Sequence, residues 1–226
     1  RAESTDLAKT FDMSPHVYDI YEFLSTHPSL RSFELSRGVT EDLRPPSKLF
    51  AGRSNKREPS GPTLPRLEHL RGSVRFISDL LQRNAETKHL TSLHIESGFT
   101  PKCSPDLNIT TMRQCLALIR EMHSAGRLPS LQVLAIDSQT YGSSIQFTIL
   151  DFLSPLSLAP LSLPFIHTAQ FHTSQWSHHT PAQWTPCEAR AIFRGFNALF
   201  PRATTVQFGL MREWAVLREE DTRRQV

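Results

Sequence analysis

Apolar residues recur along this chain in one outline that occurs six times. The outline is close to Leu-x-x-Leu-x-Leu, and in five copies a proline stands two positions before the first apolar anchor. Lys88 takes the place of that proline in the third copy. The copies align without gaps and cover residues 27–35, 64–72, 88–96, 128–136, 163–171 and 200–208.

The last two anchors of each copy alternate with other residues, which is the period of a strand that buries one face. A preceding proline favours extended backbone and ends whatever structure comes before it. Gly72 stands at the last anchor of the second copy, and we expect it to weaken that strand because it has no side chain to pack. The predicted strands lie near residues 31–36, 68–72, 91–96, 132–137, 167–172 and 204–208.

Between the copies, apolar residues follow helical spacing. Val17, Ile20, Tyr21 and Leu24 fall at i, i+3, i+4 and i+7 and form one apolar stripe. Helix-start signals of the Ser/Thr-Pro or capping-box type precede three such stripes. We predict helices over residues 15–25, 111–124 and 186–199, a shorter one from 74 to 81, and a short buried one over 145–153.

Alternation of one strand and one helix predicts an α/β fold with a parallel sheet on one face and helices on the other. Each unit has to stack on its neighbour to close its core. We therefore expect residues 1–226 to form a single repeat domain, an irregular leucine-rich-repeat-like solenoid.

Two regions fall outside this plan. Residues 39–63 are rich in proline, serine, glycine and charge, so we expect a disordered insertion, with a functional loop or a nuclear-import patch around residues 53–57 as the alternative. The C-terminal residues 209–226 carry Trp214 and Leu217 on a charged background. That composition favours a capping helix over the last open edge of the array.

The phrases HPSLRSFELS, LPRLEHLRGS, LTSLHIE and LPSLQVLAID resemble the leucine-rich-repeat-like C-terminal regions of fungal, especially basidiomycete, F-box proteins. The resemblance covers roughly residues 15–210. It implies that the repeats recognise a substrate for a ubiquitin ligase, while an F-box binds a Skp1-type adaptor. No segment here resembles an F-box, so that adaptor is a partner only if an F-box lies upstream of Arg1. Loss of the F-box, or its original absence, are the alternatives.

The composition limits the classes of partner and the cellular locations that we expect. A formal net charge of +3 lacks the dense basic field that nucleic-acid or anionic-membrane binding needs, so we expect neither partner. The longest apolar run, residues 145–163, is broken by charge and proline and does not predict a membrane span. Three cysteines argue against a disulfide framework and favour a cytoplasmic or nuclear protein. The chain opens without methionine or an apolar leader, which is compatible with a domain excised from a longer protein.

Candidate catalytic chemistry is sparse. His167, His172, His178 and His179 fall within thirteen residues, yet no H-E-x-x-H or C-x-x-C spacing accompanies them. Carboxylates such as Asp137 are spread over separate units, and solvated surface groups are their expected state. We predict no catalytic residue, no metal ligand and no cofactor. A histidine-dependent metal-binding enzyme and a purely structural repeat protein are the alternatives.

Residues that alternate with the buried anchors point to the opposite, concave face of the predicted sheet. They are small or polar, with no stripe of one charge sign. Solenoids commonly bind partners on such a face, so we expect a non-catalytic protein-interaction module with a protein partner of unknown identity. The predicted contact residues are Glu34, His69, Arg71, His94, Glu96, Gln170 and Gln207.

Overall fold

The computed structural model describes seven stretches of the chain. Almost all of the predicted insertion at residues 39–63, and the whole predicted helix at 145–153, lie outside them. The described stretches are residues 17–35, 63–83, 87–99, 105–140, 161–173, 185–210 and 213–218.

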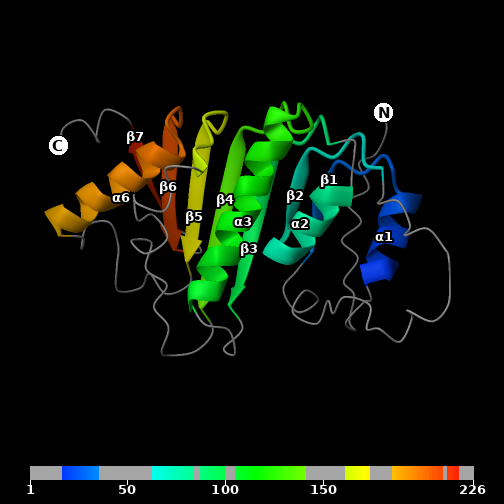
Figure 1. The fold of residues 1–226 in the computed structure, drawn as a ribbon, viewed down its shortest axis with the longest axis horizontal. Coiled ribbons are helices and arrows are strands. Elements are labelled where there is room, and N and C mark those ends of the chain that lie inside the picture. Colours follow the sequence, from blue (N-terminus) through cyan, green and yellow to red (C-terminus); the bar gives the residue numbers. More distant parts are fainter. Residues whose placement is uncertain are drawn as a thin grey trace.

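One seven-stranded sheet forms the centre of the fold, with its strands in the order of the sequence (Figure 1). The first six strands run parallel, which confirms the six predicted strands and their direction. The last strand pairs antiparallel with the sixth. The strands are β1 (Ser32–Glu34), β2 (His69–Ser73), β3 (Ser92–Phe99), β4 (Val133–Thr140), β5 (Thr168–Thr173), β6 (Thr205–Leu210) and β7 (Glu213–Arg218).

The register of the six parallel strands follows the gap-free alignment of the sequence copies. The middle anchor of each copy is the register partner of the middle anchor in the next. This row consists of Phe33, Leu70, Leu93, Leu134, Ala169 and Val206. Because side chains alternate along a strand, all six lie on one face of the sheet, where the first five are buried.

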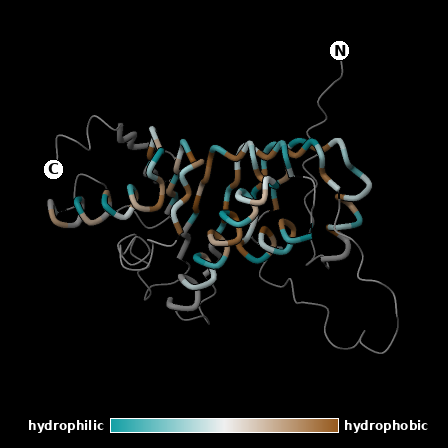
Figure 2. The backbone as a smooth tube through the Cα atoms, turned by 45° about the horizontal axis from the view of Figure 1, so that its top comes forward, coloured by the Kyte–Doolittle hydropathy of each residue, from teal (hydrophilic) through white to brown (hydrophobic). Residues whose placement is uncertain are grey.

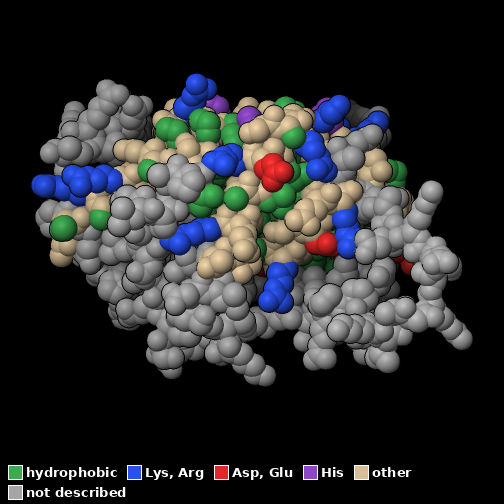
Figure 3. All heavy atoms as spheres, in the orientation of Figure 1, with side chains coloured by type: hydrophobic (Ala, Val, Ile, Leu, Met, Phe, Trp, Pro, Cys, Tyr) green, Lys and Arg blue, Asp and Glu red, His purple; other side chains and the backbone are tan. Residues whose placement is uncertain are grey.

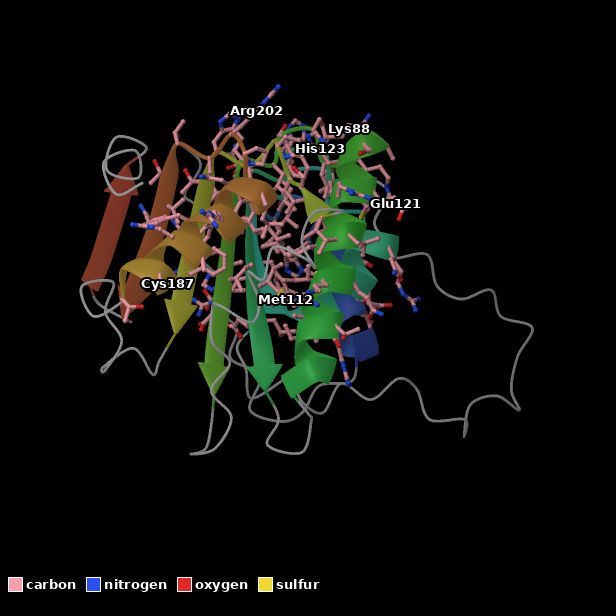
Figure 4. The ribbon with its side chains drawn as sticks, turned by 60° about the vertical axis from the view of Figure 1, so that its left-hand side comes forward. Lys88, Met112, Glu121, His123, Cys187 and Arg202 are labelled. Atoms are coloured by element: carbon pink, nitrogen blue, oxygen red, sulfur yellow. The ribbon has the colours of Figure 1, made fainter. Side chains whose placement is uncertain are left out.

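Helices cover that face (Figures 1 and 4). The described helices are α1 (Val17–Thr26), α2 (Val74–Arg83), α3 (Pro105–Ser124) and α6 (Pro186–Leu199). Their buried residues join the strand anchors in a single hydrophobic cluster. Along the elements in Figure 2 apolar and polar residues alternate, as expected when each has one buried face.

The predicted start of α3 is wrong by six residues. The helix begins at Pro105, at a position where proline loses no helical hydrogen bond, and Thr111 lies in its second turn. The capping-box pattern from Thr111 to Gln114 therefore caps nothing. The apolar residues of α3 at i, i+3, i+4 and i+7 are buried; they are Met112, Cys115, Leu116 and Ile119.

The C-terminal capping helix is also wrong in the part that the structure describes. β6 continues to Leu210, and after a two-residue connection β7 pairs back along it, with Val206 opposite Leu217. An exposed sheet edge carries unused N–H and C=O groups, and a hairpin strand satisfies them where a helix would not. Trp and Val also favour strands.

Each of the six parallel strands is preceded by the same four-residue turn. In every turn the anchor N–H donates to the carbonyl three residues earlier, over 3.0 to 3.4 Å. Proline stands second in five turns because its φ suits that position, and Lys88 stands there in the remaining one. The bonds join Leu30 to His27, Leu67 to Leu64, Leu90 to Thr87, Leu131 to Leu128, Ile166 to Leu163 and Ala203 to Phe200.

Directly after each of the first five turns, one carbonyl joins its unit to the next. The Glu68 oxygen accepts hydrogen bonds from two successive N–H groups, those of Thr91 and Ser92, at 2.9 and 3.0 Å. The same double acceptance recurs between every pair of neighbouring units. The accepting carbonyls are those of Arg31, Glu68, Thr91, Gln132 and His167.

Gly72 has a packing role that its sequence position does not reveal. It is buried in β2, and a Cβ built there would lie 2.9 Å from Cδ1 of Phe76. Phe76 belongs to α2 and is itself almost fully buried. The absent side chain therefore makes room for the Phe76 ring. Ser73 also begins the helix, since its hydroxyl accepts the Phe76 N–H at 3.3 Å.

Candidate interaction surface

The sheet residues that alternate with the anchors form three rows on the face opposite the helices, called here the polar face. The register of the parallel strands places each row across the sheet. The first row is Ser32, His69, Ser92, Val133, Thr168 and Thr205; the second is Glu34, Arg71, His94, Ala135, Gln170 and Gln207; the third is Ser73, Glu96, Asp137 and His172.

Arg71 is the centre of a charged cluster on this face. Its Nη1 lies 2.9 Å from Oε1 of Glu34, and its Nε donates to Oε1 of Glu96 at 2.8 Å. Its Nη2 lies 3.9 Å from Oδ2 of Asp137. The planar fork of a guanidinium suits several carboxylates at once, so one side chain ties strands β1 to β4 together.

Two of these carboxylates are buried. Glu96 is 2% exposed and Asp137 is 3% exposed. Burying a carboxylate is costly unless a cation and hydrogen bonds compensate it, and Arg71 supplies such compensation. The cluster therefore contributes to the fold as well as to the surface.

Two histidines lie beside this cluster. Nε2 of His94 is 4.0 Å from Oδ2 of Asp137, and the rings of His94 and His172 stack with centroids 5.1 Å apart. Burial lowers the pKa of His172; Asp137 opposes this shift and Arg71 adds to it. The His172 imidazole is thus neutral at neutral pH.

The other half of the polar face is neutral. Nε2 of Gln170 donates a hydrogen bond to Oε1 of Gln207 at 2.9 Å, which links β5 to β6. Thr168 and Thr205 stand beside them in the first row, and all four are partly exposed. Amides and hydroxyls can both donate and accept, so this half offers adaptable hydrogen bonding.

The structure brings only some of the predicted contact residues together. Glu34, Arg71 and Glu96 form one ion-pair network, with His94 beside it, and Gln170 and Gln207 form a separate pair. His69 is exposed in the first row. The expectation that Glu96 is an accessible docking charge is wrong, because its side chain is buried against Arg71.

Sequence reasoning missed Asp137 and His172 as members of this face. Asp137 was expected to be a solvated carboxylate, whereas it is buried on β4. A signal did exist, because Glu96, Asp137 and His172 each directly follow the last anchor of their copy and become register partners. That column of the alignment places them in one row.

Of the four clustered histidines, the structure describes two. His167 is exposed in a turn and His172 lies on the polar face, while His178 and His179 fall outside the described residues. Within the part that is described, no group of three or more His, Cys, Asp or Glu side chains is placed to hold a metal ion. Burial raises the pKa of the Cys115 thiol to about 11, which makes it a poor nucleophile.

The helix-bearing face carries two shallow hollows between α2 and α3, of about 310 and 320 Å³. They share Gln82 and Leu118, and the second also contains Ser78 and Asp79. Neither hollow has a histidine in its lining that could activate a nucleophile. Figure 3 shows basic and acidic side chains scattered over this face.

Comparisons with protein-family models, with curated proteins and with solved structures found no match. Among the described helices, none combines the length and the apolar character needed to cross a bilayer. The role of the protein therefore has to follow from its own side chains.

Proposed function

We propose that the protein is a non-catalytic interaction module whose polar face binds a protein partner. The observation that carries this proposal is the one-sided construction of the sheet. The described helices lie on the anchor face, and the six parallel strands present three rows of mostly polar residues on the other. A broad polar surface suits a macromolecule better than a small ligand, which requires an enclosed pocket.

We further infer that the fold is a leucine-rich-repeat-like solenoid. Three features support this: the strands follow one another in sequence order, the same turn precedes each parallel strand, and the same doubly accepting carbonyl joins successive units. Each unit then contacts its neighbours in the sequence, as in a one-dimensional array. Arrays of this kind use the strand face to bind extended or folded partners.

The two halves of the polar face contribute differently to such binding. Arg71 is held from three sides by carboxylates, so its guanidinium is already oriented before a partner arrives. Preorganised groups lose less conformational entropy on binding. The Gln170 and Gln207 amides supply the adaptable contacts, because they are partly exposed and neutral.

The resemblance to fungal F-box proteins suggests what the partner is. On that proposal the partner is a substrate of a ubiquitin ligase, and a Skp1-type adaptor binds elsewhere, through an F-box upstream of Arg1. Sequencing the full reading frame tests this directly. A frame without an F-box would remove the ligase connection and leave the interaction module.

Comparative capture from the native cell tests the polar face itself. The face variant combines His69→Ala, Gln170→Ala and Gln207→Ala, all at least partly exposed, and a matched control combines Arg75→Ala, Gln82→Ala and Arg194→Ala, exposed on the helices. We expect specific partners to disappear with the face variant and to persist with the control, while both variants melt close to wild type. Identical partner lists from wild type and face variant would reject the polar face as the binding site.

A further inference from the structure

The six turns that precede the parallel strands lie along one edge of the sheet. Parallel strands have their N-terminal ends at the same edge, and the register keeps the turns in line. Neighbouring strands are about 4.8 Å apart, so the line from first to sixth turn extends over about 24 Å. Figure 4 shows Lys88 and Arg202, from the third and sixth turns, at the same end of the molecule, far from Cys187.

This turn edge is defined as residues 27–31, 64–68, 87–91, 128–132, 163–167 and 200–204. These residues hold four cationic side chains, Arg31, Arg66, Lys88 and Arg202, against a single carboxylate, Glu68. Their formal net charge is therefore +3, the same as that of the whole chain. Over the rest of the chain, basic and acidic side chains are equal in number.

The one carboxylate of the turn edge neutralises little of this charge. Glu68 lies 3.5 Å from Arg31, and the two side chains are 38% and 71% exposed. Such exposed ion pairs are weak. Arg66, Lys88 and Arg202 are exposed to solvent as well, on the second, third and sixth turns.

Between these cations, the fourth and fifth turns are uncharged. They carry Pro129, Pro164 and the partly exposed Phe165. The Phe165 ring stacks on His123, with centroids 3.6 Å apart and planes 5° from parallel. Burial lowers the pKa of His123, so this stack adds an apolar surface and no charge at neutral pH.

We propose that the turn edge binds an extended acidic segment of a partner protein. Its carboxylates face Arg66 and Lys88 at one end and Arg202 at the other, and an apolar side chain between them contacts Phe165. The third and sixth turns are about 14 Å apart, which about four residues of extended chain span, and about seven residues cover the whole edge. This inference concerns a surface other than the polar face and does not depend on it.

The spacing of the cations favours a peptide over a nucleic acid. Three adjacent turns carry exposed cations, Arg31, Arg66 and Lys88, and the next exposed cation lies three strands away. Duplex DNA presents one negative charge for about every 1.7 Å of its axis and calls for a denser positive field. An acidic peptide can place its few carboxylates to match.

A display library of random eight-residue peptides, selected on the whole protein, tests the proposal. The edge variant combines Arg66→Ala, Lys88→Ala and Arg202→Ala; its control, Arg75→Ala, Arg190→Ala and Arg194→Ala, removes as many exposed cations from the helices. We expect peptides with acidic ends and an apolar centre to be enriched on wild type and control only. A selected peptide should bind the edge variant at least about tenfold more weakly, and bind wild type more weakly at high salt.

Several results would overturn this inference. One is a selection that enriches no acidic peptides. Another is a selected peptide whose affinity falls equally for the edge variant and the control. The third is tighter binding of single-stranded DNA or of phosphatidylserine vesicles than of the selected peptide. Gln170→Ala with Gln207→Ala should leave peptide affinity unchanged. The turn edge and the polar face can therefore fail separately.

Discussion

The two halves of the polar face differ in how far their polar side chains are buried. Across β1 to β4, charged side chains are drawn inward, and Arg71 holds buried Glu96 and Asp137 together. Across β5 and β6, neutral amides and hydroxyls remain partly exposed. Buried charges make a face rigid and costly to alter, whereas exposed amides can change partners at little cost in stability. The charged half should therefore contribute more to folding stability, and the neutral half should adapt more readily to a partner.

The largest expected effect is that of Arg71→Ala. It removes the cation 2.8 Å from the buried Glu96 carboxylate, and breaking a buried ion pair from one side costs about 3–5 kcal/mol. Urea denaturation measures the change. Arg31→Ala, which breaks the exposed pair with Glu68, is the control and should cost less than about 1 kcal/mol. Equal losses in the two variants would show that the charged half has no special structural role.

Gly72→Ala probes the opposite face of the same strand. The added methyl meets the Phe76 ring at 2.9 Å, and overpacking of this kind costs about 1–3 kcal/mol. Because Phe76 is buried, its ring has little room to move. Adding Phe76→Leu should recover part of the loss in the same denaturation experiment. A stabilised Gly72→Ala variant would contradict this packing.

His172, one of the two histidines beside the charged cluster, should make stability depend on pH. The pKa of His172 is lowered in the folded protein, so below about pH 6.5 the unfolded chain binds a proton that the folded protein does not. The free energy of unfolding should fall as the pH drops through this value and continue to fall until the lowered pKa is reached. Comparing wild type with His172→Gln by urea denaturation at pH 7.5 and 5.5 isolates this contribution. If the free energy of unfolding changed equally with pH in wild type and His172→Gln, this contribution would be absent.

The neutral half should respond least. Gln170→Ala and Gln207→Ala each remove one side of a single neutral hydrogen bond, worth about 0.5–1.5 kcal/mol at most, and the groups left behind can turn to water. Thermal denaturation should show small shifts, while partner binding weakens. A loss as large as that of Arg71→Ala would remove the distinction between the halves.

We expect wild type and a variant without His172 and His178 to have the same metal content. Purified protein should contain no stoichiometric zinc, and replacing His172 and His178 should leave that result as it is. Zinc bound in a one-to-one ratio and lost in the double variant would favour a metal-binding enzyme instead.

Local pattern predicted most of the scaffold. Strand alternation and proline position located the six parallel strands, and the gap-free alignment placed Leu93 opposite Leu134. Thr185 followed by proline located α6 from residue 186 to 199. Two weaker signals gave wrong predictions. The capping-box pattern at Thr111 lies inside α3 and does not start it. Trp214 and Leu217, three residues apart, were expected in a capping helix and belong to β7.

The sequence predicted only part of the polar face. Its location followed from alternation, because residues between buried anchors must point to the other face. Its chemistry did not, since Arg71 and Glu96 are 25 residues apart and meet only when β2 pairs with β3.

What the sequence determined by itself is therefore the periodic part of this protein: the strands, their shared face and their register, because those depend on spacing within each copy. What only the tertiary structure decided is how each side chain is solvated. Glu96 and Asp137 are buried, Gly72 makes room for Phe76, and the cations of distant turns fall on one line. Burial and charge depend on neighbours from other units, and stacking alone brings those neighbours together.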